Sequence, residues 1–363
     1  MVRMRIGVPR EIKDGERRVG LAPDGARRLV GAGHRVLVER SAGAAVGFDD
    51  ASYARCGAEV VDVRDVWRCE LIVKVKELQP PEYEWLVRGT TIFGYAQLAR
   101  DPSLVNAVLR AGVRVIAYEL VRDASGALPL LAPMSRIAGR LAPLIGAQSL
   151  LTDRGGSGVL VTGVDRVSGA NVVVIGAGTA GTEAARIAAR LGCRVTVLSR
   201  GAARVHALAE ALARSGTPII AHTMDAIRAH GFAAAIADAD LVIGAVLDPG
   251  KLSPRLITRA HLRSMRAGSA FVDIGIDQGG IAETSRMTKL SSPTYVEERI
   301  VHYAVPNMPS LVARTATEAL TSATLPYVER LARGVSQALA EDPGLAQAVM
   351  VADGAIANAD LAR

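Results

Sequence analysis

The stretch NVVVIGAGTAGTEAARIAARLGCRVTVLSR, residues 171–200, decides the fold of this 363-residue chain. The apolar run 171–175 predicts a buried strand, and the Ala-rich segment after the glycines predicts a helix that reaches Leu191. Residues 194–198 predict the next strand. A strand, a Gly-x-Gly-x-x-Gly turn and a helix in this order are typical of a dinucleotide-binding βαβ unit, whereas the glycine pattern alone would be weak evidence.

Each position of the turn has a physical role in such a unit. Gly176 allows the tight turn, Gly178 lets the backbone approach a pyrophosphate, and Gly181 lets the helix pack on the strand. Thr179 and Ala180 open the helix, where unpaired N–H groups and the helix dipole attract phosphate. A glycine turn with a purely structural role is the alternative, and it leaves the flanking strand and helix unexplained.

The end of the second strand indicates which dinucleotide is bound. A site for NAD(H) usually places Asp or Glu about twenty residues past the glycines, on the ribose 2′-hydroxyl. Here Ser199 and Arg200 stand at that point, and Arg204 follows. A hydroxyl and a guanidinium attract a 2′-phosphate that a carboxylate would repel. The pattern favours NADP(H) over NAD(H), unless Arg200 is only a solvated surface arginine.

Composition excludes several classes of protein. Half of the residues are hydrophobic and the mean hydropathy is +0.24, so the chain can bury a large core and is not disordered. The net charge of +7 suggests a nucleic-acid binder, but only five of the 43 basic residues are lysine and aromatic residues make up 4%. The arginines form no basic run, so we expect a small anionic ligand at most and no nucleic-acid partner.

Cysteine usage and hydropathy indicate the compartment. Cys56, Cys69 and Cys193 are far apart, form no CxxC pair and have no histidine beside them, so we predict neither disulfides nor a metal site. The N-terminal sequence has no apolar signal core, and no run reaches the roughly 18 apolar residues of a membrane span. We therefore expect a soluble, cytoplasmic protein without a membrane partner.

The regions on either side of this motif alternate strands with helices. Residues 24–32 predict a helix capped by Asp24 and ended by the glycine of GAGH, and residues 103–111 predict another helix. This alternation predicts parallel sheets with right-handed crossovers. The remaining strands are predicted at residues 5–8, 35–39, 71–75, 91–95, 113–118, 241–245 and 270–274.

Two lobes account for this pattern. Residues 134–151 predict a long helix joining the lobes, bent or locally opened at Pro143, and residues 154–169 predict a glycine-rich loop or hairpin. A late helix at 315–333 is expected to pack back on the first lobe. The predicted fold class is α/β with two doubly wound, Rossmann-like lobes. Residues 1–133 plus 308–363 form a discontinuous substrate domain, and residues 134–307 form the dinucleotide-binding domain.

The chain resembles the alanine dehydrogenase family, which includes the soluble NAD(H)-binding subunit of proton-translocating transhydrogenase. The resemblance implies an active site in a cleft between two doubly wound lobes and a homo-oligomer, usually a hexamer, with a dimer as the alternative. It runs nearly end to end. It is carried by RIGVPREIKDGERRVGLAP (5–23), LIVKVKE (71–77), LPLLAPMSRIAGRLA (128–142), GAGTAG (176–181), LVIGAVLDPGKLSPRLIT (241–258), MRAGSAFVDIGIDQGG (265–280), ETSRMT (283–288), VPNMPS (305–310) and RTATEALTSATLPYV (314–328).

The resemblance implies roles for particular residues. An arginine and a lysine hold the substrate carboxylate in the family, and these positions match Arg18 and Lys76. A bidentate guanidinium and an ammonium suit a carboxylate chemically. From the sequence alone, Arg18 would be a solvated residue in an exposed turn. Lys74 and Lys76 would share one side of a strand, facing a cleft or solvent.

Three further residues match family positions near the cofactor. Ser135 corresponds to a serine that contacts the cofactor, Asp277 to an aspartate of the active site, and Asn307 to a residue that orients nicotinamide and substrate. Asp277 and Asn307 each follow a predicted strand, at the edge where α/β proteins bind ligands. The alternative for Asp277 is a simple Asp-Gln-Gly-Gly turn.

One family residue is replaced. Members that interconvert alanine and pyruvate carry an acid–base histidine in a segment like FTYLHLA, whereas this chain has FGYAQLA with Gln97 at that position. Glutamine can hydrogen-bond a reacting oxygen but cannot titrate, so we expect poor alanine dehydrogenase activity. Asp277 or Lys76 would have to carry the remaining protons.

These observations lead to one main hypothesis and two alternatives. The main one is an NAD(P)-dependent oxidoreductase acting on the C–N bond of a small amino acid, imino acid or 2-oxo acid. Its substrate would differ from alanine, and its reaction would be the reduction of an imine or keto acid. The first alternative is a plain L-alanine dehydrogenase. The second is a non-catalytic dinucleotide-binding partner, which the retained carboxylate-binding residues argue against.

Overall fold

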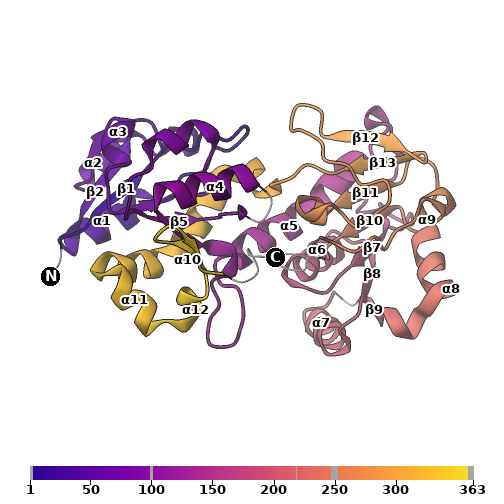
Figure 1. Cartoon of the computed structure of the whole chain (residues 1–363). Coiled ribbons are helices and arrows are strands. Elements are labelled where there is room, and N and C mark those ends of the chain that lie inside the picture. The colour runs from indigo at the N-terminus through magenta and orange to yellow at the C-terminus, as the bar shows by residue number, and fades with distance from the viewer. Residues whose placement is uncertain (1–2, 99–100, 218, 247–251, 359–363) are drawn as a thin grey trace. The chain divides into compact units, whose positions relative to one another are not determined.

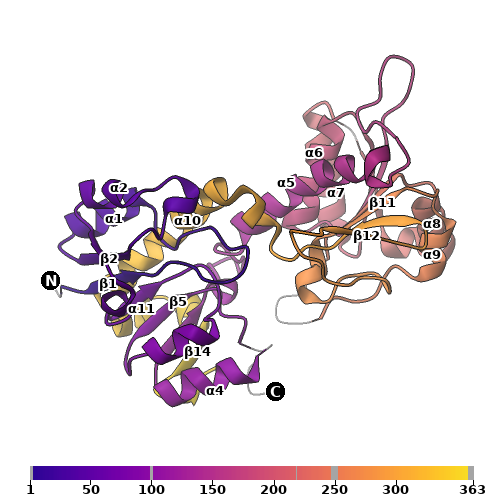
Figure 2. The ribbon, with the colours of Figure 1, turned by 90° about the horizontal axis from the view of Figure 1, so that it is seen from above.

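The computed structural model describes residues 3–98, 101–217, 219–246 and 252–358, without side chains at 227–230. Close packing of the backbone divides the chain into two compact units (Figures 1 and 2). Unit 1 comprises Met1–Met134 and Ser310–Arg363, and unit 2 comprises Ser135–Pro309. Each unit is built on its own sheet, and both are described separately below.

The sheet of unit 1 has eight strands in the order β15-β14-β6-β5-β4-β1-β2-β3. The six strands from β6 to β3 are parallel, and β14 and β15 add antiparallel pairs at one edge. The central strands are short apolar runs, as expected for strands buried on both faces. The bounds are β1 Arg5–Val8, β2 Arg35–Glu39, β3 Glu59–Val61, β4 Leu71–Val73, β5 Thr91–Gly94, β6 Arg114–Ala117, β14 Val349–Ala352 and β15 Ala355–Ile356.

Helices of unit 1 cover this sheet and bring the C-terminal segment back to it. On one face, α3 and α4 bury residues such as Val66 and Leu104 against Ile72 and Ile92. The last long helix, α10, packs against α1 and β4, so residues far apart in sequence share one core. The bounds are α1 Pro23–Gly31, α2 Asp50–Arg55, α3 Val63–Val66, α4 Pro102–Ala111, α10 Ala313–Arg333, α11 Val335–Glu341 and α12 Pro343–Ala346, with 3₁₀ turns η1 Ala44–Val46, η2 Pro80–Trp85, η4 Tyr118–Leu120 and η7 Met308–Val312.

The sheet of unit 2 has seven strands in the order β12-β13-β11-β10-β7-β8-β9. All neighbours are parallel except β12 and β13. The strand order reverses direction at β7, and this is where ligands bind in doubly wound sheets. The bounds are β7 Asn171–Ile175, β8 Arg194–Ser199, β9 Ile220–Thr223, β10 Leu241–Gly244, β11 Ala270–Asp273, β12 Thr294–Glu297 and β13 Ile300–Tyr303.

Helices lie on both faces of the unit 2 sheet because alternate strand residues point to opposite sides. Val172 and Val174 pack with α5, α6 and α7, whereas Val173 and Ile175 pack with α8 and α9. The predicted α/β class with two doubly wound lobes is therefore confirmed. The bounds are α5 Ala132–Ser149, α6 Thr179–Arg190, α7 Ala202–Arg214, α8 Met224–Ala237 and α9 Arg259–Ser264, with η5 Thr152–Arg154 and η6 Ile274–Gln278.

The predicted connections are largely present. The α5 helix is continuous through Pro143. Within the glycine-rich stretch, an isolated antiparallel bridge joins Val164 and Val167, so the segment makes a tight hairpin that projects from its unit in Figure 2. None of the helices built from the described residues is both long and apolar enough to cross a membrane.

The structure corrects three local predictions. Asp24 does not cap α1: Ala22 is the N-cap without a side-chain bond, Pro23 begins the helix, and Asp24 lies in its first turn. The third strand ends at Val73 rather than at residue 75. Both sheets are mixed rather than wholly parallel, because β12, β14 and β15 pair antiparallel at their edges.

The close approach of α5 to α6 gives a testable prediction. A Cβ at Gly139 would lie 2.2 Å from the Ala180 carbonyl oxygen, so Gly139→Ala must push the two helices apart. We expect a loss of about 1–3 kcal/mol in unfolding free energy, measured by urea denaturation followed by circular dichroism. In the control Gly31→Ala, the new Cβ meets nothing within 4 Å at the end of α1, and no loss is expected. Equal stability of the two variants would contradict this packing.

Candidate functional site

The residues predicted to bind substrate in unit 1 all follow neighbouring parallel strands. Arg18 follows β1, Lys76 follows β4 and Gln97 follows β5, and these strands lie side by side in the order β5-β4-β1. The carboxyl ends of parallel strands share one edge of the sheet, and adjacent strands are about 4.8 Å apart. Lys76 and Gln97 therefore lie on one edge, where α/β proteins carry their ligand sites. Gly20, two residues after Arg18, packs against the end of β4, since a Cβ there would lie 2.3 Å from the Val73 carbonyl oxygen, and this brings the segment of Arg18 to the same edge.

Arg18 is buried, with 1% of its surface exposed, which corrects the expectation of an exposed turn. Its Nε and Nη2 atoms donate to the two carboxylate oxygens of Glu16 at 2.7 and 2.6 Å, and Nη1 lies 2.9 Å from the Met134 sulfur. The Glu16 carboxylate also accepts the backbone N–H of Arg18 at 2.9 Å. This bidentate pair fixes the guanidinium plane.

Lys74 is fully buried and does not face a cleft or solvent, contrary to the sequence-based expectation. Its ammonium lies 3.1 Å from Glu11 and 3.0 Å from Glu82, both buried. Burial opposes the charge of Lys74, but the two carboxylates hold its pKa above the ordinary value. Burial in turn raises the pKa of the Glu11 carboxyl, although Lys74 acts against that shift. β4 ends at Val73, so the alternation of side chains along a strand does not extend to Lys74 and Lys76.

The same buried glutamate positions Lys76. Glu11 accepts the backbone N–H of Val75 at 2.5 Å and that of Lys76 at 3.4 Å. Lys76 is 6% exposed, and with Lys13 its charge holds the pKa of the neighbouring Glu77 carboxyl below its usual value, against the effect of burial. Lys13 also forms an ion pair with Glu77. The backbone that carries Lys76 is thus held by the buried carboxylate of Glu11.

Gln97 has an unusual backbone conformation. Its φ is +46°, in the left-handed region that costs energy for most side chains. Glu119, in the turn η4 directly after β6, stabilises this conformation. Its carboxylate accepts hydrogen bonds from the N–H of Gln97 at 2.9 Å and from that of Ala96 at 3.1 Å. Glu119 was not among the site residues predicted from the sequence. The only available signal was an acidic residue directly after a predicted strand.

A small hollow lies beside Lys76 in unit 1. Its lining is mostly apolar and comes from β5, β6, α4 and the segments after β4 and β5. The residues that line it are Lys76, Glu77, Leu78, Ile92, Gly94, Tyr95, Ala96, Leu98, Leu104 and Val115.

In unit 2 the glycine turn has the geometry that its sequence predicts. Gly176 has φ +112°, and a Cβ there would lie 2.5 Å from the Ala245 carbonyl oxygen. A Cβ at Gly181 would lie 1.8 Å from the Gly176 oxygen, so only glycine allows α6 to start this close to β7. A Cβ at Gly178 would meet nothing within 4 Å, so the space in front of this N-cap residue is open. Thr179 and Ala180 form the first turn of α6, whose N–H groups face that opening.

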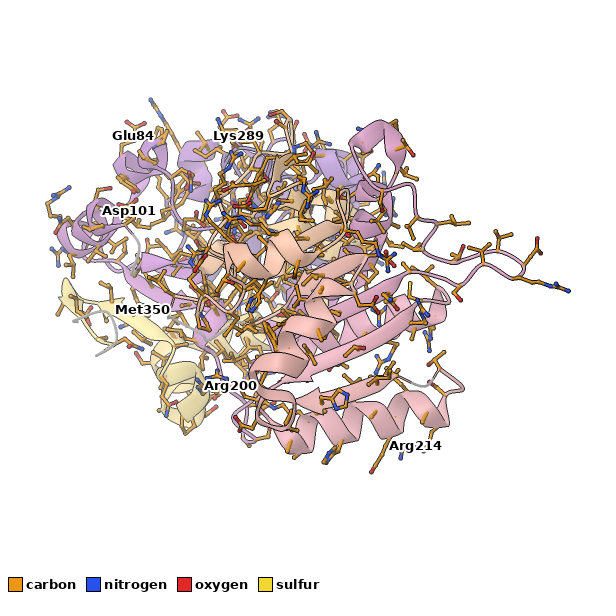
Figure 3. All side chains as sticks on the ribbon, turned by 90° about the vertical axis from the view of Figure 1, so that its right-hand side faces the viewer. Glu84, Asp101, Arg200, Arg214, Lys289 and Met350 are labelled. Carbon is orange, nitrogen blue, oxygen red and sulfur yellow. The ribbon has the colours of Figure 1, made fainter. Side chains whose placement is uncertain are left out.

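The three residues predicted to select the dinucleotide follow the adjacent strand. Ser199 ends β8 and is half-buried, and Arg200 and Arg204 are exposed at the start of α7. The Gly176 N–H donates to the Leu198 carbonyl at 2.7 Å, which joins this strand end to the glycine turn. In the described part of the chain, neither arginine is paired with a carboxylate. Figure 3 labels Arg200 among the side chains of unit 2.

Asp277 and Asn307 lie together in unit 2. The Asn307 N–H donates to the Asp277 carboxylate at 3.3 Å, and Asn307 has φ +61°. Asp277 belongs to η6, directly after β11. The buried Asp273 accepts from the backbone N–H of Gly275 at 3.1 Å and of Ile281 at 2.9 Å, so it closes the loop that carries Asp277.

Two further predictions concern the remainder of the site. Ser135 is half-buried in α5, at the start of unit 2. Among the described residues, no group of three His, Cys, Asp or Glu side chains is arranged to hold a metal ion.

Comparison with known proteins accounts for both units. A family model described as the N-terminal domain of alanine dehydrogenase/PNT matches residues 7–138, and a model of the corresponding C-terminal domain matches residues 142–359. The chain is 48% identical over 354 residues to a protein named alanine dehydrogenase from Halomonas elongata, covering 97% of this chain and 94% of the relative.

Solved structures of similar proteins also cover nearly the whole chain. A structure titled L-alanine dehydrogenase superposes with a TM-score of 0.93 at 43% identity, covering 99% of this chain and 98% of that one. A structure titled transhydrogenase from Sinorhizobium meliloti superposes with a TM-score of 0.81 at 25% identity, covering 98% and 99%.

The buried charges beneath the site predict a pH-dependent stability defect. Lys74→Met leaves Glu11 and Glu82 buried without their cation, and we expect a loss of roughly 3–5 kcal/mol in unfolding free energy at pH 8. A carboxyl whose pKa is raised in the folded state binds more protons there than when unfolded, so stability falls as pH rises. The loss should therefore be smaller at pH 5.5, as measured by urea denaturation at both values.

The control is Arg5→Met, which removes an exposed partner of Glu70 and should change stability by less than ~1 kcal/mol at either pH. A Lys74→Met variant whose stability matches the wild type at pH 8 would show that this cluster carries no uncompensated charge.

Proposed function

Because this chain belongs to the alanine dehydrogenase/PNT family, we propose that it is a pyridine-nucleotide-dependent oxidoreductase that acts on the C–N bond of a small amino acid. Unit 1 would bind the acid and unit 2 the dinucleotide. The observation that carries the proposal is the pair of buried cations, Arg18 and Lys76, on one edge of the unit 1 sheet. A protein that only bound a dinucleotide would have no use for them.

The arrangement suits a substrate carboxylate. Buried cations meet a carboxylate in a low dielectric, where charge-assisted hydrogen bonds are stronger than in water. Glu16 holds the Arg18 guanidinium and Glu11 holds the backbone of Lys76 before the substrate arrives, which reduces the entropy lost on binding. The hollow beside Lys76 is small and mostly apolar, which supports a short side chain on the substrate.

The residues of unit 2 fit a dinucleotide. The open space in front of Gly178 can take a pyrophosphate against the N-terminus of α6, with Gly176, Thr179, Ala180 and Gly181 forming the turn. Ser135, Asp277 and Asn307 would contact the nicotinamide end. When bound, the nicotinamide supplies the hydride acceptor or donor, and the protein supplies position and electrostatics.

Gln97 supports a narrower reaction as a second candidate. Ammonia addition and loss of water need a group that exchanges protons, whereas hydride transfer to a ready-made imine needs mainly orientation. Gln97 cannot exchange protons, and Asp277 and Lys76 are the titratable residues predicted from the sequence to do so instead. The second candidate reaction is therefore the reduction of a preformed imino acid. The substrate would then differ from that of the enzymes named alanine dehydrogenase.

We extend the proposal to assembly and location. The hairpin before β7 exposes Leu160, Val164 and Val167 by 54–68%, a group of apolar side chains that supports self-association. A hexamer, or a dimer, and a cytoplasmic location remain predictions. Light scattering on the purified protein would measure the oligomer mass.

The proposed function is tested by a substrate screen. Purified protein is incubated with NADH or NADPH, a series of 2-oxo acids with ammonia, and cyclic imino acids. We expect oxidation of one nucleotide with a small substrate. Arg18→Met and Lys76→Met should each lower kcat/KM for the acid by at least 100-fold without changing nucleotide binding, measured by fluorescence titration. Wild-type protein that binds the nucleotide but oxidises none of it with any substrate would contradict the proposal.

Cofactor choice gives a separate prediction. The proposed preference for NADPH rests on Ser199 and Arg200, which would bind the 2′-phosphate. Arg200→Glu should lower kcat/KM for NADPH by at least 10-fold and leave the value for NADH nearly unchanged, because a carboxylate repels the phosphate. The matched control is Arg214→Glu, at the far end of α7. Equal loss with both nucleotides would assign Arg200 a structural role instead.

A further inference from the structure

We propose that Glu119 is the group that exchanges protons with the substrate in this enzyme, in place of the side chain that Gln97 cannot provide. The inference rests on the proposed function and deepens it, because it names the residue that makes the ammonia-dependent reaction possible. It is drawn from the position of Glu119 in unit 1.

The sheet topology places Glu119 beside the substrate-binding residues. Glu119 follows β6, Gln97 follows β5 and Lys76 follows β4, and these three strands are adjacent and parallel. With about 4.8 Å between strands, the three segments lie within roughly 10 Å along one edge. A hydrogen bond of 2.9 Å from the Gln97 N–H holds the Glu119 carboxylate against the segment that follows β5.

The Glu119 carboxylate is held by backbone N–H groups and is not part of an ion pair in the described part of the chain. One oxygen accepts from Ala96 and Gln97, and the other accepts from Ala96 alone, at 3.2 Å. Glu119 is half-buried, and in the described part of the chain its carboxylate accepts hydrogen bonds from backbone N–H groups alone. Among described residues, no cation forms an ion pair with Glu119, in contrast to Glu11, Glu16 and Glu82. A carboxylate in a permanent ion pair would not be available for proton exchange.

The charged surroundings suit a proton acceptor. Burial raises the pKa of the Glu119 carboxyl, while the N–H groups and the charge of Lys76 act against the rise. The groups that face it are Lys76, from the segment after β4, and Tyr95, whose phenol donates to the Leu130 carbonyl at 2.7 Å. A general base works best with a pKa close to the pH of the reaction, and these effects move Glu119 in that direction.

The proton transfers can be written for oxidation of an amino acid. After hydride transfer, water attacks the iminium carbon, a C–O bond forms, and Glu119 takes the proton that the water loses. Glu119 then returns this proton to the nitrogen, the C–N bond breaks and ammonia leaves. The hydroxyl proton passes to solvent as the carbonyl forms. The Gln97 amide would hydrogen-bond the same oxygen without taking a proton.

The variant Glu119→Gln tests this assignment, since it keeps an acceptor for the N–H groups of residues 96 and 97 but cannot titrate. With the amino acid that corresponds to the best 2-oxo acid of the screen, oxidised by the matching nucleotide, we expect steady-state kcat to fall by about 10²-fold or more. Rapid mixing should still give a burst of reduced nucleotide close to the enzyme concentration, because hydride transfer precedes the lost step. The acidic limb of the pH profile of kcat should disappear.

Two further variants complete the test. Gln97→His in the Glu119→Gln background should restore kcat at least 10-fold, since an imidazole can exchange protons at the same edge. Glu59→Gln, which changes an exposed partner of Arg35, should behave as wild type.

A kcat within threefold of wild type, or a loss of kcat with no burst, would overturn the role of Glu119. Failure of the wild-type enzyme to oxidise any amino acid would overturn the proposed function itself, and the two outcomes are separated by the wild-type assay alone.

Discussion

Four neighbouring parallel strands of unit 1 end at a single edge, and this constraint organises the candidate substrate site. Arg18, Lys76, Gln97 and Glu119 each follow one of these strands, β1, β4, β5 and β6. They are up to a hundred residues apart in sequence. Hydrogen-bonded register between the strands, rather than any local motif, sets the spacing of the side chains that follow them.

The site is held together by buried carboxylates. Glu16 hydrogen-bonds the guanidinium of Arg18. Glu11 binds both the ammonium of Lys74 and the backbone N–H of Lys76. Buried ion pairs add little to stability, since desolvation offsets most of their attraction. Their contribution here is geometric: two cations are held in place in a dry environment before a ligand arrives.

Unit 2 uses backbone geometry instead of buried charge. Close contacts with protein backbone require glycine at positions 176 and 181, whereas a Cβ at Gly178 would meet nothing within 4 Å. The loop of Asp277 is closed by the buried Asp273 and joined to the positive-φ residue Asn307. Strained backbone at Asn307, as at Gln97, is a feature of sites where position matters more than local stability.

The α/β class, most strand and helix positions and the glycine turn could be predicted from the sequence, because apolar periodicity and glycine spacing are local signals. The sequence did not predict the antiparallel edges formed by β12, β14 and β15, which depend on pairing between distant segments. The burial of Arg18 and Lys74 and the hydrogen bond between Glu119 and Gln97 became evident from the folded chain alone. Burial and contact are set by what packs against a residue, and in this chain those partners come from remote strands and loops.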